Sequence, residues 1–134
     1  VLQLQNKGYQ VAIETQGSKW NDALLFIDEV TLSPKPPSSQ METDFTILSE
    51  MIAKLSGRNI SLKVVIFAEK DLQYAKEIYQ RYPNIPLEDE AATAEYLMKC
   101  YRELVGAVMN STTLKNVRVL PQLYALLWGN RRGV

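Results

Sequence analysis

The chain has 134 residues, of which 46% are hydrophobic and 22% are charged, and its formal net charge is +0. These values are typical of one globular domain with its own core. The balanced charge shows no basic excess that would favour nucleic acid, and no apolar run is long enough to span a bilayer. We therefore expect no nucleic-acid partner and no membrane partner.

Two residue counts restrict the chemistry that this chain can perform alone. Its one cysteine, Cys100, excludes an internal disulfide and a cysteine-cluster metal site, and it favours a reducing compartment, which we take to be the cytoplasm. The absence of histidine excludes a Ser–His–Asp triad and an imidazole-ligated zinc site. The sequence thus assigns this chain no catalytic residue and no metal ligand.

Strand and helix patterns alternate along the chain, and glycine or proline marks several of their ends. The expected elements, in order, are a helix over 1–7, strands over 9–17 and 24–33, a helix over 41–56, a strand over 61–67, helices over about 72–82 and 89–110, and a strand over 116–122.

This alternation predicts an α/β fold with parallel strands. It does not distinguish a doubly wound sheet from part of a (β/α) barrel. Both architectures bind ligands at the carboxyl ends of their strands. Those ends are predicted at residues 14–17, 33–35, 67–69 and 121–122.

The loop "SPKPPSSQM" (33–41) is the leading candidate for a ligand site. Ser33 and Lys35 flank Pro34, and a hydroxyl beside an ammonium suits a carboxylate, a ribose or a phosphate. The prolines stiffen the loop, which favours a site positioned by a rigid scaffold. The alternative is a solvated proline-rich connection.

Other polar residues near the strands are ambiguous. Glu14 and Gln16 share one side of a strand, where they could bind a ligand amine or hydroxyl, cap a helix or face water. Lys63 interrupts the apolar "SLKVVIF" and is interpreted as structural, either pairing with a carboxylate or extending to solvent. The acidic run 88–90 is interpreted as charge at a helix N-terminus.

Three stretches together resemble one family. They are "AIETQGS" (12–18), "SPKPPSS" (33–39) and "VRVLPQLYALLWGNRRGV" (117–134), and "SLKVVIF" and "YPNIP" stand in family order between them. Over essentially its whole length the chain resembles the C-terminal part of the 7-carboxy-7-deazaguanine synthases, which are radical S-adenosylmethionine enzymes of queuosine biosynthesis.

The resemblance implies a partial (β/α) barrel of the radical S-adenosylmethionine type, with parallel strands and outer helices, and a carbon–nitrogen lyase activity. Intact members convert 6-carboxy-5,6,7,8-tetrahydropterin to 7-carboxy-7-deazaguanine with loss of ammonia. They use S-adenosylmethionine, a 4Fe–4S cluster and Mg²⁺. By motif, Ser33, Pro34 and Lys35 would contact S-adenosylmethionine, and Glu14 and the carboxylate of Val134 would contact the pterin. The implied partners are a second copy in a homodimer and an electron donor such as flavodoxin.

The chain also departs from this family. It lacks the CxxxCxxC motif whose thiolates bind the cluster. We therefore expect residues 1–134 to be the C-terminal portion of one barrel domain, with the cluster and Mg²⁺ ligands outside this chain, which alone would be inactive. A family strand and loop are missing near residues 87–88, either because the segment is deleted or because this sequence omits it. Tyr124 stands where members often have histidine, which alters any substrate contact made there.

Two alternatives remain at this point. One is another radical S-adenosylmethionine enzyme, such as an activase that makes a glycyl radical on a partner, although "SPKPPSS" argues against it. The other is a non-catalytic α/β binding module.

Overall fold

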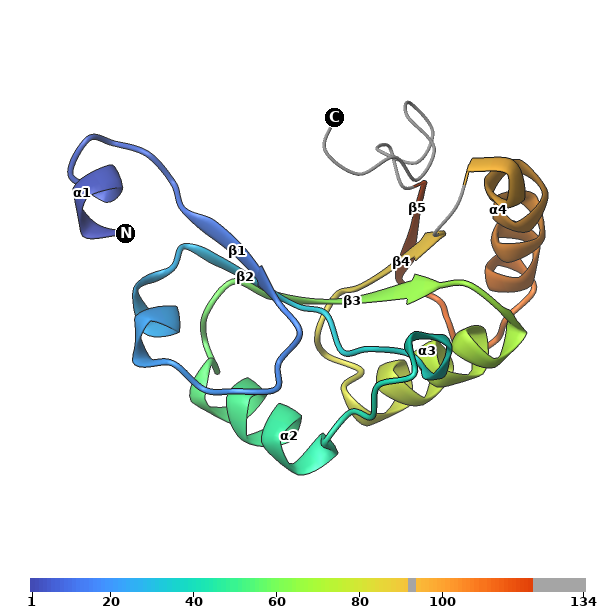
Figure 1. Ribbon diagram of the computed structural model, residues 1–134, viewed down its shortest axis with the longest axis horizontal. Coiled ribbons are helices and arrows are strands. Elements are labelled where there is room, and N and C mark those ends of the chain that lie inside the picture. The colour runs from blue at the N-terminus through green and yellow to red at the C-terminus, as the bar shows by residue number, and fades with distance from the viewer. Residues whose placement is uncertain (92–93, 122–134) are drawn as a thin grey trace.

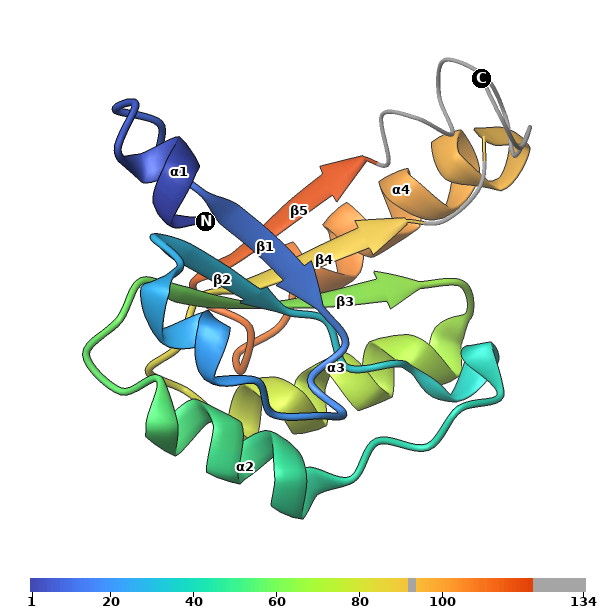
Figure 2. The same cartoon turned by 60° about the vertical axis from the view of Figure 1, so that its left-hand side comes forward.

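The structure of the chain, a computed structural model, describes residues 1–91 and 94–121. Its strands form one parallel five-stranded sheet in the order β1-β2-β3-β4-β5, which is also their order along the chain (Figures 1 and 2). The elements are α1 (Leu2–Gln5), β1 (Ala12–Thr15), the 3-10 helix η1 (Asp22–Phe26), β2 (Glu29–Leu32), the 3-10 helix η2 (Pro37–Ser39), α2 (Phe45–Lys54), β3 (Ile60–Ile66), α3 (Glu69–Arg81), β4 (Leu87–Ala91), α4 (Ala94–Met109) and β5 (Val117–Pro121). None of the helices in these described ranges has the length and apolar character needed to cross a membrane.

The helices α2, α3 and α4 cover the same face of this sheet (Figures 1 and 2). A doubly wound sheet reverses its strand order and carries helices on both faces. The described sheet does neither, so the α/β class with parallel strands is confirmed and the doubly wound alternative is not supported. Winding in one direction with helices on one side is the arrangement found in the wall of a (β/α) barrel.

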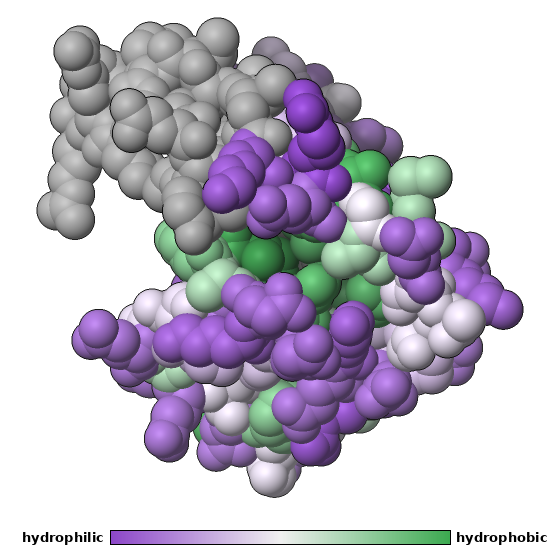
Figure 3. All heavy atoms as spheres, turned by 90° about the vertical axis from the view of Figure 1, so that its right-hand side faces the viewer, coloured by the Kyte–Doolittle hydropathy of each residue, from purple (hydrophilic) through white to green (hydrophobic). Residues whose placement is uncertain are grey.

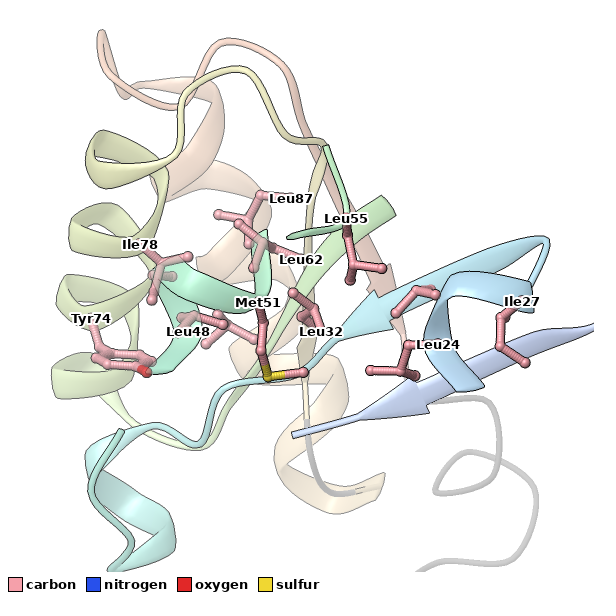
Figure 4. Close-up of a cluster of buried hydrophobic side chains, with 13 residues drawn as sticks. Leu24, Ile27, Leu32, Leu48, Met51, Leu55, Leu62, Tyr74, Ile78 and Leu87 are labelled. Carbon is pink, nitrogen blue, oxygen red and sulfur yellow. The ribbon is translucent and has the colours of Figure 1, made fainter. Parts of the chain in front are cut away.

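The main core lies between β2, β3 and the helices α2 and α3 (Figure 4). Alternate residues of β3, Leu62 and Val64, are fully buried, as are Leu48 of α2 and Leu55, the residue directly after α2. Burying a side chain of this size contributes roughly 1.5–3 kcal/mol. This packing fixes the strands whose carboxyl ends carry the candidate site.

Two of the expectations from the sequence are wrong near residues 87–94. The helix expected from residue 89 begins at Ala94, and residues 87–91 form the strand β4. The acidic run 88–90 therefore lies in a strand and not at a helix N-terminus. Acidic residues disfavour strands locally, but parallel pairing with β3 on one side and β5 on the other outweighs that preference.

The strand expected over 24–33 is also shorter. Its first part forms η1, where the Asn21 side chain accepts a hydrogen bond from the Ala23 N–H at 2.9 Å and so caps the helix. Leu24 and Ile27 of this segment are buried in the core. An apolar run that packs as a short helix has the same composition as a buried strand, which explains the error.

A buried carboxylate fastens the loop 33–41 to the beginning of α3. Asp71 is 0% exposed and accepts hydrogen bonds from the backbone N–H groups of Phe67 (2.9 Å), Ala68 (3.0 Å) and Ser38 (3.0 Å). The Phe67 and Ala68 donors lie at the N-terminus of α3, whereas Ser38 belongs to η2. One side chain thus holds two loops together and has the donors that a buried charge requires.

We predict that Asp71→Ala lowers the free energy of unfolding by about 3 kcal/mol, because it leaves three partly buried N–H groups without an acceptor. Asp71→Asn should cost less, since one carbonyl oxygen remains. The control is Asp44→Ala at the exposed N-cap of α2, which should cost about 1 kcal/mol. Urea denaturation measures all three, and an Asp71→Ala loss no larger than that of Asp44→Ala would contradict the anchoring role.

A second carboxylate ties the beginning of β1 to the beginning of β2. Asp28 Oδ2 accepts hydrogen bonds from the Val11 N–H at 2.7 Å and from Gln5 Nε2 at 3.1 Å. These bonds, the one from Val11 above all, lower the pKa of the exposed Asp28 carboxyl. The charged form of Asp28 is therefore the form that the fold favours.

The stability contributed by Asp28 should depend on pH in a definite direction. Its folded pKa lies below the unfolded value of about 3.9, so the contribution is present above that value and is lost as pH falls through the folded pKa. We expect Asp28→Asn to lower the Tm more at pH 7 than at the lowest pH at which the protein stays folded. Glu50→Gln, on the exposed side of α2, is the control. Equal Tm decreases for Asp28→Asn at both pH values would refute this prediction.

Candidate functional site

The side chains of the sheet divide between two faces. One face packs against the helices, and the other, here called the open face, is not covered by α2, α3 or α4 (Figure 1). Strand alternation and register place a polar set on the open face. Its described members include Glu14, Glu29, Thr31, Ser61, Lys63 and Arg118.

Polar contacts on the open face run across the strands. The hydroxyl oxygens of Thr31 and Ser61 lie 3.0 Å apart, between β2 and β3. Lys63 Nζ donates to Glu14 Oε2 at 3.1 Å, and the two side chains are 20% and 47% exposed. Because β1 and β3 are separated by β2, the Lys63 side chain extends across β2 to reach Glu14. Lys63 thus holds a carboxylate that remains accessible to a ligand.

Ser33 lies directly beside the end of β1. Its N–H donates to the Thr15 carbonyl oxygen at 2.7 Å, and the residue is 1% exposed. Its Oγ has no hydrogen-bond partner within the described part of the chain. An unpaired buried hydroxyl costs about 1–3 kcal/mol, so Ser33 Oγ is a polar atom that the described residues leave without a partner.

Lys35 lies two residues after Ser33 in the same loop. It is half-buried, and its neighbours Pro34 and Pro36 are buried. Its carbonyl oxygen accepts a hydrogen bond from Thr43 Oγ1 at 3.2 Å. The side chain borders an open cavity of about 480 Å³, which is lined by Lys35, Pro37, Gln40, Met41, Glu42, Thr43 and Tyr74. Figure 3 views the molecule from the side toward which the β3 arrow points in Figure 1. On this side, hydrophobic atoms lie in a hollow, with hydrophilic atoms above and below it.

Four of the residues expected at the site lie in or just after two neighbouring strands, and their role in binding stays a prediction. Glu14, Ser33, Pro34 and Lys35 all lie at the carboxyl edge of the neighbouring strands β1 and β2. Val134 and Tyr124 lie outside the described residues.

Gln16 and Lys63, two further polar residues singled out in the sequence, each form a side-chain contact in the structure. The Gln16 side chain donates to Ser18 Oγ at 3.0 Å, so its amide is engaged locally. Lys63 does pair with a carboxylate, as one interpretation of the sequence had it, but sequence reasoning missed its place beside Glu14 in the site. The available signal was alternation: Ser61 and Lys63 fall on the face opposite to the buried Leu62 and Val64.

An iron–sulfur cluster does not fit the residues of this chain. A 4Fe–4S cluster with one open iron takes three thiolates, and the sequence has one cysteine. Among the described residues, no three or more potential ligands of the His, Cys, Asp and Glu types gather to hold a metal ion. What the described site offers is a carboxylate, a hydroxyl and an ammonium that can bind and orient a polar organic molecule.

The sequence is similar to that of three curated proteins that share one name, although no protein-family model matches the chain. It is 47% identical to the 7-carboxy-7-deazaguanine synthase of Bacillus cereus, over 98% of this chain and 60% of that protein. Identity to the protein of the same name from Bacillus subtilis is 41%, with the same coverage. Identity to the one from Thermoplasma acidophilum is 28%, over 100% of this chain and 61% of that protein.

The chain spans about three fifths of the length of the curated relatives that it matches. The alignment with the Bacillus cereus protein extends over 142 residues, more than the 134 residues of this chain, so that relative has residues without a counterpart here. The resemblance noted in "AIETQGS" and "SPKPPSS" is confirmed: along nearly its whole length, this chain is similar to proteins named 7-carboxy-7-deazaguanine synthase.

Proposed function

We propose that this chain is the C-terminal portion of a 7-carboxy-7-deazaguanine synthase. The observation that carries the proposal is the 47% identity along 98% of the chain to a relative of that name. The parallel sheet, wound in chain order with helices on one face, supports a partial (β/α) barrel of the radical S-adenosylmethionine type. The position of Glu14, Ser33 and Lys35 at the carboxyl ends of β1 and β2 supports a ligand site where such a barrel has one.

The proposed reaction of the intact enzyme is a ring contraction. It converts 6-carboxy-5,6,7,8-tetrahydropterin to 7-carboxy-7-deazaguanine and one ammonia, which accounts for every atom of the substrate and makes the enzyme a carbon–nitrogen lyase. S-adenosylmethionine, bound at a cluster whose ligands lie outside this chain, supplies the radical chemistry. Mg²⁺ ligands also lie outside this chain. The residues described above therefore bind and orient, and none of them is assigned a reactive role.

Each site residue has a role that its chemistry suits. The unpaired Ser33 hydroxyl and the Lys35 ammonium fit the ribose hydroxyl and carboxylate groups of S-adenosylmethionine. Pro34 limits the freedom of the backbone between them. Glu14 accepts hydrogen bonds from the N–H groups of the pterin while Lys63 holds its carboxylate. The carboxylate of Val134 is assigned to the pterin on the motif alone.

The proposal extends to the whole protein. It is a homodimer in the cytoplasm, takes electrons from a donor such as flavodoxin and has neither a nucleic-acid nor a membrane partner. The neutral net charge supports the absence of a nucleic-acid partner.

Turnover by the protein expressed from its complete gene tests this function. After reconstitution with iron and sulfide, and with Mg²⁺ and a reductant, we expect it to convert the pterin to 7-carboxy-7-deazaguanine and equimolar ammonia, measured by mass spectrometry. Its intact mass should exceed 15.2 kDa. Cleavage of S-adenosylmethionine without pterin turnover would contradict the proposal, and a glycyl radical on an added partner protein would favour an activase instead.

Two substitutions should separate the two ligands. Lys35→Ala should weaken S-adenosylmethionine binding by roughly tenfold, because a charged hydrogen-bond donor is lost, and leave pterin affinity unchanged. Glu14→Gln should do the reverse. Calorimetry on the reconstituted protein measures both affinities, with the exposed Lys70→Ala on α3 as the control. Unchanged cofactor affinity in Lys35→Ala would remove that residue from the cofactor site.

A further inference from the structure

The first turns of α3 contact the candidate cofactor loop at a second point, beyond the Asp71 anchor. The Tyr74 hydroxyl donates to Thr43 Oγ1 at 2.7 Å, and Thr43 Oγ1 in turn donates to the Lys35 carbonyl oxygen at 3.2 Å. These two hydrogen bonds form a relay that begins on a core helix and ends on the backbone of a proposed ligand contact. Neither Tyr74 nor Thr43 belongs to the motif that suggested the cofactor.

We propose that Tyr74 and Thr43 are positioning residues for Lys35, and that their relay sets the direction in which the Lys35 ammonium meets S-adenosylmethionine. This inference rests on the proposed function, because it takes the loop ligand to be that molecule. Thr43 bonds the Lys35 backbone and Tyr74 bonds Thr43, so both act on Lys35 through that carbonyl oxygen.

The two neighbouring prolines restrict the backbone dihedral angles at Lys35. The relay therefore acts on the one variable that they leave, the orientation of the Lys35 carbonyl. Lys35 stands between Pro34 and Pro36, and a residue before proline is restricted to extended conformations. Proline also fixes its own φ on either side. The remaining variable is the orientation of the Lys35 carbonyl, and the Thr43 hydroxyl binds that oxygen.

The Tyr74 ring is itself held in place. The residue is 9% exposed, and its ring centroid lies 6.2 Å from that of Phe45 at a tilt of 46°. The Arg81 guanidinium covers the Phe45 ring at 4.2 Å. Burial raises the pKa of the Tyr74 phenol, so it stays protonated and remains a donor throughout the neutral range. With its acceptor site occupied by Tyr74, the Thr43 hydroxyl directs its own proton to Lys35.

Tyr74→Phe tests the relay, with Tyr82→Phe as a matched control. Tyr82 is the residue following α3, and its hydroxyl oxygen lies 2.7 Å from Ser49 Oγ, so both substitutions remove a phenol hydroxyl with a hydrogen bond of the same length. In the complete reconstituted protein, we expect Tyr74→Phe to weaken S-adenosylmethionine binding by roughly 2- to 10-fold in calorimetry, without changing pterin affinity. Tyr82→Phe should change neither affinity.

A double-mutant cycle of Tyr74 and Thr43 gives a second test, because residues with a purely structural role would not show the result expected here. Thr43→Val should lower cofactor affinity as Tyr74→Phe does, the double variant should lose no more than either single variant, and Thr43→Ser should restore binding. Backbone amides of residues 38–41 should also exchange faster in Tyr74→Phe than in Tyr82→Phe, with no ligand present.

The outcomes separate this inference from the proposed function. If the unaltered protein fails to bind S-adenosylmethionine, the proposed function is wrong and this inference falls with it. If the unaltered protein binds but Tyr74→Phe behaves as Tyr82→Phe does, only the relay is overturned. A cycle with additive losses, or an equal loss of pterin affinity, would also overturn it, because either result indicates general loosening.

Discussion

The three hydrogen bonds that Asp71 accepts determine where the candidate site can lie. One donor, Ser38, comes from the loop after β2, and the other two come from the junction of β3 with α3. A fully buried carboxylate needs its hydrogen-bond donors in place. Without them, the free-energy cost of removing the charge from water is not offset, and the fold is destabilised. The carboxyl ends of β2 and β3 are therefore joined by a constraint that lies outside the sheet, and it holds the loop after β2 against the beginning of α3.

The two faces of the sheet contribute in different ways. The helix-facing side supplies the apolar burial that fixes the strands, while the open face carries the polar residues. The Glu14–Lys63 pair on that face is partly exposed, and such pairs contribute about 0–1 kcal/mol to stability. Stability alone gives little reason for a lysine to extend across a whole strand. A better reason is that Lys63 holds the Glu14 carboxylate in one orientation for the proposed ligand.

Local sequence patterns were sufficient to predict the α/β class and the parallel strands, and they place the predicted site residues at the ends of β1 and β2. They failed at β4, where acidic residues form a strand because β3 and β5 pair with it, and at η1, where an apolar run packs as a 3-10 helix. They also missed Lys63, whose partner is far away in the sequence. The unpaired Ser33 hydroxyl has no sequence signal at all, since only tertiary burial shows that nothing in the described chain meets it.

In the proposed function, the residues of this part of the protein bind and orient a ligand, and a stiff loop suits that role. The proposed radical reaction needs its reacting atoms kept at a fixed separation, because misplacement slows the intended step and permits others. A glycine hinge would serve a lid that opens and closes. Pro34 and Pro36, with Asp71 and the Tyr74–Thr43 relay behind them, instead make a loop whose geometry is set before any ligand arrives. Binding then orders little of the loop, and the ligand's binding energy remains for orientation.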